Sequence, residues 1–144
     1  MHVNIKKLKE NATIPTKGSR YCAGYDLYSC LLEPVTIQPG ETAKIPTGLA
    51  VEIPQGYAGL IFARSGLSTK KGLAPANKVG VCDSDYRGEY IVALHNHSNQ
   101  SAVVNPGERI AQLVVVPFLE VDFVEVDNLS KTSRGDGGFG STGE

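Results

Sequence analysis

Glycine and proline interrupt this chain so regularly that almost no segment is long enough for an extended helix. The 144 residues include 16 glycines and 8 prolines, and the only stretches as long as 17 residues that lack both are 89–105 and 118–134. The first of these stretches is itself broken by the polar run His95–Gln100, which is typical of a turn. The chain is therefore predicted to fold from short β-strands joined by turns.

Segments rich in Val, Ile and Thr lie between these interruptions, and each has the length of a strand. In Leu49–Ile53 the large apolar residues occupy alternate positions, as in a strand with one buried face. The predicted strands are Val35–Ile37, Thr42–Ile45, Leu49–Ile53, Tyr57–Ala63, Tyr90–Leu94, Ala102–Val104 and Ile110–Phe118. Short strands at this spacing predict an all-β sandwich or barrel.

Two tight turns and one short helix complete the predicted architecture. Gln38–Glu41 and Asn105–Glu108 both place Pro and then Gly at their centre, which is the pattern of a type II turn. One helix is predicted over Ser65–Lys71, with Ser65 as its cap and Gly72 as its end. Because 144 residues are the size of one ordinary domain and no linker divides them, a single folded domain is expected.

Composition and charge exclude several classes of protein. Fourteen Lys and Arg against 15 Asp and Glu give a net charge of -1, so the chain lacks the basic excess of an electrostatic nucleic-acid binder. The longest apolar run, at 113–119, is much shorter than the roughly 20 residues of a membrane span, and the amino terminus has no apolar core like that of a signal peptide. Three cysteines without CxxC spacing argue against structural zinc and a disulfide framework, so a cytoplasmic location is predicted.

The most informative chemical cluster is Gly80–Glu89, which is predicted to form a β-hairpin that returns through Tyr90–Leu94. Asp83 and Asp85 are two residues apart, so both carboxylates would lie on one face while the strand continues. A carboxylate in this position can accept a proton from a water molecule and orient it, as a general base does. The alternative is an ordinary solvated turn, because Asp is common in turns.

Two further clusters are suited to a phosphorylated ligand. Ala63–Ser68 brings Arg64, a hydroxyl and a glycine amide to a helix start, where an anion would be stabilised; an ordinary capped helix is the alternative. The tail Arg134–Gly143 has five glycines in ten residues but also an aromatic ring, a guanidinium and two hydroxyls, which suit stacking on a base and wrapping phosphates. A tail without fixed structure is the alternative there. His95 and His97 have no third ligand nearby, so no metal site is predicted from them.

Taken together and in this order, five segments closely resemble the five ordered motifs of the trimeric deoxyuridine triphosphatases (dUTPases). The segments are Ala23–Ser29, Ala63–Ser68, Gly80–Glu89, Gly107–Gln112 and Arg134–Gly143. The resemblance covers nearly the whole chain. The sequence departs from the family pattern at Ala63, where a proline is usual, and at Cys82, where an aliphatic residue is usual.

The resemblance implies a jelly-roll-like, distorted β-barrel with one short helix, assembled as a homotrimer with active sites between subunits. Residues 1–126 would form the barrel domain, and residues 127–144 a flexible, glycine-rich arm that closes over a site built by neighbouring chains. The implied reaction is hydrolysis of dUTP to dUMP and pyrophosphate. Mg²⁺ is the implied cofactor, held mainly by the triphosphate, and Asp26 would support it indirectly through water.

The resemblance also assigns roles to individual residues. Asp83 would activate the water that attacks the α-phosphorus, and Tyr86 would pack under the deoxyribose, where a 2′-hydroxyl would clash. A narrow uracil slot lined by backbone would exclude thymine by its methyl group and cytosine by mispaired hydrogen-bonding groups. The implied binding residues are Asn77, Gly80, Val81, Cys82 and Ile91 for uracil, Arg64, Ser65, Gly66, Gln112 and Arg134 for phosphates, and Phe139, Gly140, Ser141 and Thr142 for stacking and wrapping by the arm.

Two other functions compete with this one. The dCTP deaminases share the fold and the triphosphate contacts, but deamination in that family uses a glutamate on the strand after the hairpin, and Tyr90–Leu94 contains no carboxylate. A non-catalytic module that senses nucleotides would be indicated by loss of Asp83 or of the tail, and both are present. The predicted function is therefore dUTP hydrolysis, which keeps uracil out of DNA and supplies dUMP for dTMP synthesis.

Overall fold

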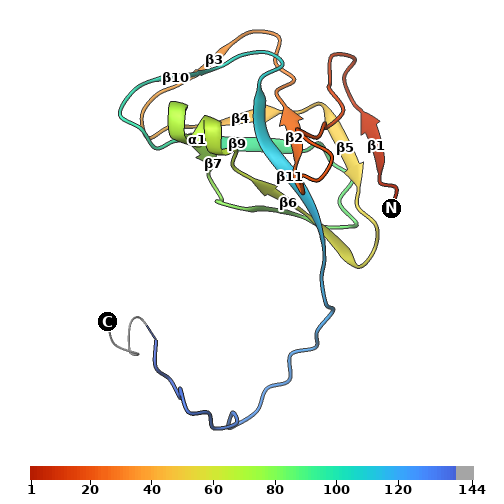
Figure 1. Cartoon of the computed structure of the whole chain (residues 1–144), viewed down its shortest axis with the longest axis vertical. Coiled ribbons are helices and arrows are strands. Elements are labelled where there is room, and N and C mark those ends of the chain that lie inside the picture. Colours follow the sequence, from red (N-terminus) through yellow and green to blue (C-terminus); the bar gives the residue numbers. More distant parts are fainter. Residues whose placement is uncertain (139–144) are drawn as a thin grey trace.

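Short antiparallel strands build almost the whole of the computed structural model, which describes residues 1–138 (Figure 1). The strands are β1 Asn4–Lys7, β2 Tyr25–Tyr28, β3 Val35–Ile37, β4 Thr42–Pro46, β5 Leu49–Glu52, β6 Tyr57–Phe62, β7 Leu73–Pro75, β8 Gly80–Cys82, β9 Ile91–Asn96, β10 Ala102–Val104 and β11 Arg109–Pro117. The helix α1, Ser65–Lys71, lies between β6 and β7. The all-β class predicted from the glycine and proline spacing is confirmed.

Four small sheets surround one hydrophobic core. Their strand orders are β2-β11-β6-β8, β4-β9-β7, β1-β5 and β10-β3, and every pair is antiparallel. The core receives side chains from each sheet, including Leu27 of β2, Ile45 of β4, Val51 of β5 and Val104 of β10. Because all four sheets share this core, they form a single barrel-like unit, with α1 lying beside it (Figure 1).

The predicted alternation of buried and exposed residues is confirmed in β5 and recurs in β9. Leu49 and Val51 are buried while Glu52 is exposed, and in β9 Val92, Leu94 and Asn96 are the buried positions. The turn predicted at His95–Gln100 begins two residues later than expected, because His95 and Asn96 are the last residues of β9. The buried Asn96 amide donates to the carbonyls of Ile37 (2.9 Å) and Gln100 (2.7 Å), which closes that turn.

Both predicted type II turns are confirmed. The fourth residue of each turn donates its N–H to the carbonyl of the first, over 3.0 Å in Gln38–Glu41 and 3.2 Å in Asn105–Glu108. Gly40 and Gly107 have φ angles of 76° and 70°, a region that favours glycine. The second turn leads directly into β11, which carries part of the candidate site.

The helix has the predicted bounds but not the predicted cap. Gly72 ends it in the left-handed conformation (φ 65°) and donates its N–H to the Ser68 carbonyl, as expected. Ser65 is the first helical residue rather than the cap; Arg64 occupies the cap position and makes no side-chain capping bond. The Arg64 side chain is instead used in an ion pair described below.

The predicted hairpin through Gly80–Leu94 is wrong. β8 pairs with β6, whereas β9 pairs with β4 and β7, so the two strands belong to different sheets. The cause lies at Tyr90, whose N–H donates to the Leu49 carbonyl (2.8 Å) and whose carbonyl accepts from the Thr47 N–H (3.2 Å). Residues 83–90 therefore form a loop that crosses from one sheet to another, with Asp83 at its start.

Three strands, β1, β2 and β7, were not predicted from the sequence, and the reason is clearest for β1 and β7. β1 has only one large apolar residue, Ile5, among its four, and β7 has three residues and ends in Pro75. Neither has a strand pattern of its own, and each is defined by its partner: β1 pairs with β5 and β7 with β9. Strand formation here depends on tertiary contacts more than on local propensity.

The chain after β11 leaves the barrel. Residues 118–138 contain no helix or strand and run as an extended segment away from the sheets (Figure 1). Leu119, Phe123 and Leu129 are 86%, 96% and 88% exposed, which is unusual for side chains of this type. Within residues 1–138, no helix is both long and apolar enough to cross a membrane.

Candidate active site

A carboxylate held between two arginines lies at one edge of the four-stranded sheet. Asp26 Oδ1 accepts from Arg64 Nε over 2.7 Å, and its Oδ2 accepts from Arg109 Nη1 over 3.2 Å. The Asp26 side chain is only 13% exposed, against 24% for Arg64 and 51% for Arg109. The cluster carries one net positive charge and fixes the direction of the Arg64 guanidinium. Sequence reasoning did not assign Arg109 a role, although it lies inside the segment Gly107–Gln112.

Three neighbouring strands bring the phosphate-binding candidates together. In the sheet, Gln112 of β11 lies opposite Asp26 of β2 on one side and Phe62 of β6 on the other, and Arg64 follows two residues after Phe62. Gln112 Nε2 donates to the Ala63 carbonyl over 2.8 Å, which fixes its amide beside Arg64. A Cβ on Gly24 would collide with the Gln112 side chain, so a glycine is required there.

An open, cationic pocket lies next to this cluster. It has a volume of about 370 Å³ and is lined by Arg64, Gly66, Leu67, Lys70, Lys71, Glu108 and Arg109. Four cations against one carboxylate suit an anionic ligand. Ser65 and Gly66 are exposed, and a Cβ on Gly66 would meet no atom within 4 Å, so packing within this chain does not explain the glycine.

Glu108 ties the helix to the start of β11. Its carboxylate forms an ion pair with Lys71 Nζ and accepts from the Asn105 N–H over 2.9 Å. Partial burial opposes ionisation, but the hydrogen bonds from Lys71 and Asn105 outweigh it and lower the pKa of Glu108 below its ordinary value. The contact fixes α1, and with it the cationic pocket, against the barrel.

Four of the five uracil-binding candidates lie in or just before β8, which pairs with β6, whereas Ile91 lies in β9 of another sheet. Asn77 lies close to Gly80, since a Cβ there would be 3.3 Å from Asn77 Nδ2. Val81 and Ile91 are 64% and 48% exposed, so each presents apolar surface to solvent. Cys82 points inward instead, where it packs against the core and burial raises the pKa of its thiol.

Tyr86 presents its ring to solvent from the loop between β8 and β9. It is 46% exposed, and its hydroxyl donates to the Glu89 carbonyl over 3.1 Å. A Cβ on Gly88 would collide with the Tyr86 ring, so the loop fits closely around it. Tyr86 is therefore an exposed aromatic surface with a fixed orientation.

Asp83 differs from Asp26 in being exposed and free of ion pairs. Its carbonyl accepts from the Tyr86 N–H over 3.2 Å, which closes the first turn of the loop. Its carboxylate makes no hydrogen bond or ion pair within the part of the chain that the structure describes. Asp83 can therefore accept a proton from a water molecule without first losing a partner.

One chain does not bring Asp83 to the phosphate-binding candidates. Cys82, next to Asp83, lies opposite Gly59 near the start of β6, whereas Arg64 follows the end of that strand. Five residues separate Gly59 from Arg64, which is about 16 Å in an extended chain. Within one subunit, the proton acceptor and the cationic pocket lie toward opposite ends of β6.

The predicted arm residues are only partly described. Arg134 is exposed, and its guanidinium Nε donates to the Gly137 carbonyl over 2.9 Å, a contact within the arm itself. Phe139, Gly140, Ser141 and Thr142 lie outside the described residues.

Residues 1–138 contain no group of three or more His, Cys, Asp or Glu side chains that could hold a metal ion. Both Asp26 oxygens already bind arginines, and His95 Nδ1 lies 3.0 Å from the Thr42 hydroxyl. A metal at this site would therefore need most of its ligands from the substrate.

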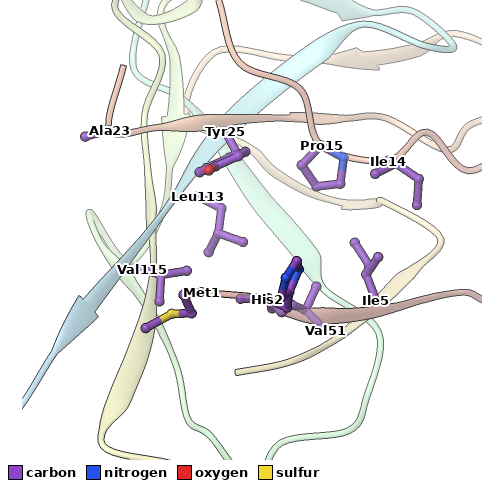
Figure 2. Close-up of a pocket in the computed structure, with 11 residues that line it drawn as sticks. Met1, His2, Ile5, Ile14, Pro15, Ala23, Tyr25, Val51, Leu113 and Val115 are labelled. Atoms are coloured by element: carbon purple, nitrogen blue, oxygen red, sulfur yellow. The ribbon is translucent and has the colours of Figure 1, made fainter. Parts of the chain in front are cut away.

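A second, apolar pocket lies away from all of these residues. It has a volume of about 390 Å³ and is lined by Met1, His2, Val3, Ile5, Ile14, Pro15, Ala23, Tyr25, Val51, Leu113 and Val115 (Figure 2). Its lining is aliphatic and aromatic apart from His2, so it does not suit a triphosphate. None of the predicted site residues lines it.

Solved structures give the class of protein that combines this barrel with a cationic pocket. The dUTPase of Staphylococcus bacteriophage 80α, solved as a point mutant with dUpNHpp, matches with a TM-score of 0.90 and 32% identity over 99% of each chain. A mutant dUTPase of phage φ11, in which the coordination of a structural Mg(II) ion is described, matches with a TM-score of 0.82 and 29% identity over 91% of this chain and all of that one. The fold is the jelly-roll-like barrel of these nucleotide hydrolases, as predicted.

Sequence comparisons identify the family. Residues 10–143 match the dUTPase family model. The deoxyuridine 5′-triphosphate nucleotidohydrolase of Nautilia profundicola is 49% identical over 144 residues, covering 100% of both chains, and that of Hahella chejuensis is 48% identical over 139 residues, covering 96% of this chain and 91% of the other. The chain belongs to the dUTPase family. The predicted family and enzyme class are therefore confirmed, in preference to a dCTP deaminase or a non-catalytic module.

Proposed function

We propose that this chain hydrolyses dUTP as a homotrimer in which each active site takes Asp83 from one subunit and the cationic pocket from a neighbour. The observation that carries this proposal is the separation of Asp83 from Arg64 and Gln112 along β6. A site confined to one chain would leave the attacking water far from the bound phosphates, whereas association of copies can bring the two ends together.

Each half of the site has a defined ligand in this proposal. Arg64, Ser65, Gly66 and Gln112 bind phosphate oxygens, and the charge of the pocket supports this assignment. Asn77 and the backbone of Gly80–Cys82 bind uracil, and Tyr86 lies under the deoxyribose. The binding of dUpNHpp by the phage 80α dUTPase supports a deoxyuridine triphosphate ligand.

The chemical step needs only one proton acceptor. The Asp83 carboxylate accepts a proton from water as the water oxygen forms a bond to the α-phosphorus. The bond from the α-phosphorus to the bridging oxygen breaks, and pyrophosphate leaves with that oxygen. Arg64 and Gln112 stabilise the negative charge on the phosphates during the attack.

Mg²⁺ fits this site as an ion carried by the triphosphate, because residues 1–138 do not themselves offer three protein ligands. Asp26 is the carboxylate that would contact its hydration shell, while continuing to orient Arg64. When bound, the ion supplies charge neutralisation on the triphosphate. The Mg(II) ion described for phage φ11 dUTPase supports a role for this metal in the family.

The arm and the assembly belong to the same proposal. Residues 127–144 would cross to a neighbouring site, where Arg134 neutralises phosphate charge, Phe139 stacks on uracil, and Gly140, Ser141 and Thr142 wrap the nucleotide. The exposed apolar side chains of residues 119–129 and the apolar pocket of Figure 2 support association, because contact between copies would bury them.

A cytoplasmic location is proposed as well, and neither nucleic acid nor membrane is a proposed partner. Cys22, Cys30 and Cys82 are all free thiols, which suits a reducing compartment. The net charge of -1 gives no electrostatic reason to bind nucleic acid.

Substrate choice is tested by measuring pyrophosphate release from dUTP, dCTP, dTTP and UTP with the full chain. We expect kcat/KM for dUTP to exceed the others by roughly two orders of magnitude or more, because the wrong base or sugar leaves groups unpaired or clashing. Equal rates with dTTP or UTP would overturn the assigned pocket, and ammonia release from dCTP would indicate deamination.

Sharing of the site is tested by subunit mixing. Asp83→Asn and Arg64→Gln chains are each expected to be nearly inactive, and a 1:1 mixture after verified subunit exchange should recover about one quarter of the wild-type activity, since each mixed trimer contains one intact site. No recovery would mean that both residues act within one chain. Mixing two Asp83→Asn preparations is the matched control, for which no recovery is expected.

A further inference from the structure

Tyr90 is a buried residue packed against Tyr86, one of the candidate site residues. It is 2% exposed and ends the loop that begins at Asp83. Its N–H donates to the Leu49 carbonyl over 2.8 Å, and its carbonyl accepts from both the N–H and the hydroxyl of Thr47, over 3.2 and 2.6 Å. Both sides of the Tyr90 peptide backbone are therefore bound to the barrel. The sequence analysis gave this residue no role beyond its strand.

The buried Tyr90 hydroxyl has no hydrogen-bond partner within residues 1–138. It is the one buried side-chain oxygen or nitrogen in residues 1–138 that makes no hydrogen bond. Burial, and after it the neighbouring Cys82, raise the pKa of the Tyr90 phenol. An aliphatic residue could fill the same core position without a polar atom to satisfy, so the phenol group itself does not explain a tyrosine here.

The Tyr90 ring has a partner above it. The rings of Tyr86 and Tyr90 are stacked, with centroids 6.2 Å apart and planes inclined by 27°. The Tyr90 ring therefore supports one face of the half-exposed Tyr86 ring. The Tyr86 hydroxyl is held as well, because it donates to the Glu89 carbonyl. Glu89 is fixed in turn, because its Oε1 accepts from the Gly48 N–H over 2.7 Å.

Cys82 completes this support from the side of β8. Its side chain points into the same hydrophobic core as Tyr90. The opposing β6 residue is Gly59, where a Cβ would lie 3.1 Å from Leu113 Cδ1, 3.3 Å from Ile53 Cδ1 and 3.4 Å from Cys82 Cβ, so the core is closely packed at this point. The Cys82 thiol and the Tyr90 hydroxyl are close enough to shift each other's pKa, so a small side chain at position 82 and a large ring at position 90 lie side by side in this part of the core.

We propose that Tyr90, together with the small Cys82, is a positioning residue that fixes the ring of Tyr86 and thereby sets discrimination between deoxyribose and ribose. The inference rests on the proposed function, which assigns Tyr86 to the sugar. Ribose differs from deoxyribose by a single oxygen. The Tyr86 ring can therefore exclude the 2′-hydroxyl only if the ring is not displaced by more than about an ångström. The Tyr86 ring meets this requirement better when it stacks on Tyr90, whose backbone is hydrogen-bonded to the barrel, than it would without that support.

The first test compares Tyr90→Leu with Tyr90→Phe in the full chain. The measured quantity is the ratio of kcat/KM for dUTP to kcat/KM for UTP. Tyr90→Leu removes the ring that supports Tyr86, and we expect the ratio to fall about tenfold because UTP is turned over faster. Tyr90→Phe keeps the ring, and the ratio should stay within about twofold of wild type. An unchanged ratio in folded Tyr90→Leu would overturn the proposal.

The second test asks whether positions 82 and 90 act as a pair. Adding Cys82→Ile to Tyr90→Leu refills the space left by the ring, and we expect it to restore most of the lost ratio. Cys82→Ile alone overfills the space and should lower the ratio. Restored thermal stability without a restored ratio would mean that the pair serves only the core, which would overturn the proposal.

Tyr86→Ala separates this inference from the proposed function. If Tyr86→Ala leaves the dUTP to UTP ratio unchanged, the assignment of Tyr86 to the sugar is wrong, and the proposed function fails at that point. If Tyr86→Ala lowers the ratio but Tyr90→Leu does not, the sugar assignment stands and the role of Tyr90 alone is refuted.

Discussion

Asp26 and Asp83 are chemically identical side chains in opposite surroundings. Asp26 is 13% exposed and binds Arg64 and Arg109, whereas Asp83 lies exposed at a loop start with no such contact in residues 1–138. A carboxylate whose two oxygens already accept hydrogen bonds from arginines has less room to orient a water molecule. A free carboxylate has no such restriction.

The difference teaches how this fold divides one reaction between two regions. In the proposed mechanism, the Asp26 carboxylate would orient cations toward the polyphosphate, and the Asp83 carboxylate would activate water. Each region is rigid for its own reason: the first because three paired strands and an ion-pair network meet there, the second because Tyr86 and Tyr90 fix the loop. Substitutions in the Asp83 region should therefore lower mainly kcat, and substitutions in the Asp26 region should change mainly KM and stability.

The largest effect is expected for Asp83→Asn. The change preserves the volume of the side chain but removes the charge that accepts the proton, so kcat for dUTP should fall by roughly two orders of magnitude or more. Binding of dUpNHpp should persist, and the unfolding midpoint should change little because the side chain is exposed. Near-normal turnover would mean that the base lies elsewhere, with Asp85 as the next candidate.

Deletion of Arg134–Glu144 should be the next most damaging change. The last strand ends at Pro117, so the barrel should remain folded, with an unchanged circular dichroism spectrum. Turnover should fall by about tenfold or more, because the arm no longer fixes the triphosphate or excludes water. Full activity of the shortened chain would contradict the proposed role of the arm.

A smaller and different effect is expected for Asp26→Asn. The variant loses the charge that orients Arg64, so KM for dUTP should rise severalfold, and the free energy of unfolding should fall by about 1 kcal/mol because a mostly buried partner of two arginines is weakened. Asp122→Asn, in the exposed segment after β11, is the control and should match wild type in both measurements. An Asp26→Asn effect on kcat alone, without loss of stability, would argue for a direct chemical role.

Much of this molecule is predictable from local sequence, and the failures have physical causes. The turns at Gly40 and Gly107 and the helix end at Gly72 follow from the conformations that glycine adopts, which depend on few neighbours. The strands from β3 to β6 follow from alternation and bounding turns. β1 and β7 have no such pattern, because their pairing partners decide their conformation.

The site was less accessible to local reasoning than the fold. Asp83, Tyr86 and Gln112 were expected from motif resemblance, but the hairpin expected around Asp83 is absent, because Tyr90 pairs its backbone with residues 47–49. The sequence motifs gave no role to Arg109 or Tyr90. Arg109 binds Asp26, which is distant in the sequence, and the stacking of Tyr90 on Tyr86 depends on the folded shape of the loop. Separation of Asp83 from Arg64 likewise depends on strand register, which only the folded chain defines.

The smallest expected effect concerns Glu108, which attaches α1 to the Asp26 side of the barrel. Its pKa is lowered in the folded chain, because the hydrogen bonds from Lys71 and Asn105 outweigh the opposing effect of burial. A lowered folded-state pKa means that the stabilisation is fully present above the unfolded value and is lost as the pH falls through the folded value. Glu108→Gln should therefore reduce the free energy of unfolding at pH 7 by less than about 1 kcal/mol, since the pair is partly exposed. The difference from wild type should shrink as the pH falls below the ordinary value of 4.5.

Glu33→Gln, at an exposed position, should show no such dependence in urea unfolding at a fixed protein concentration. If the Glu108→Gln difference stayed constant from pH 7 to pH 4, the ion pair would contribute nothing and the helix would be fixed by packing alone.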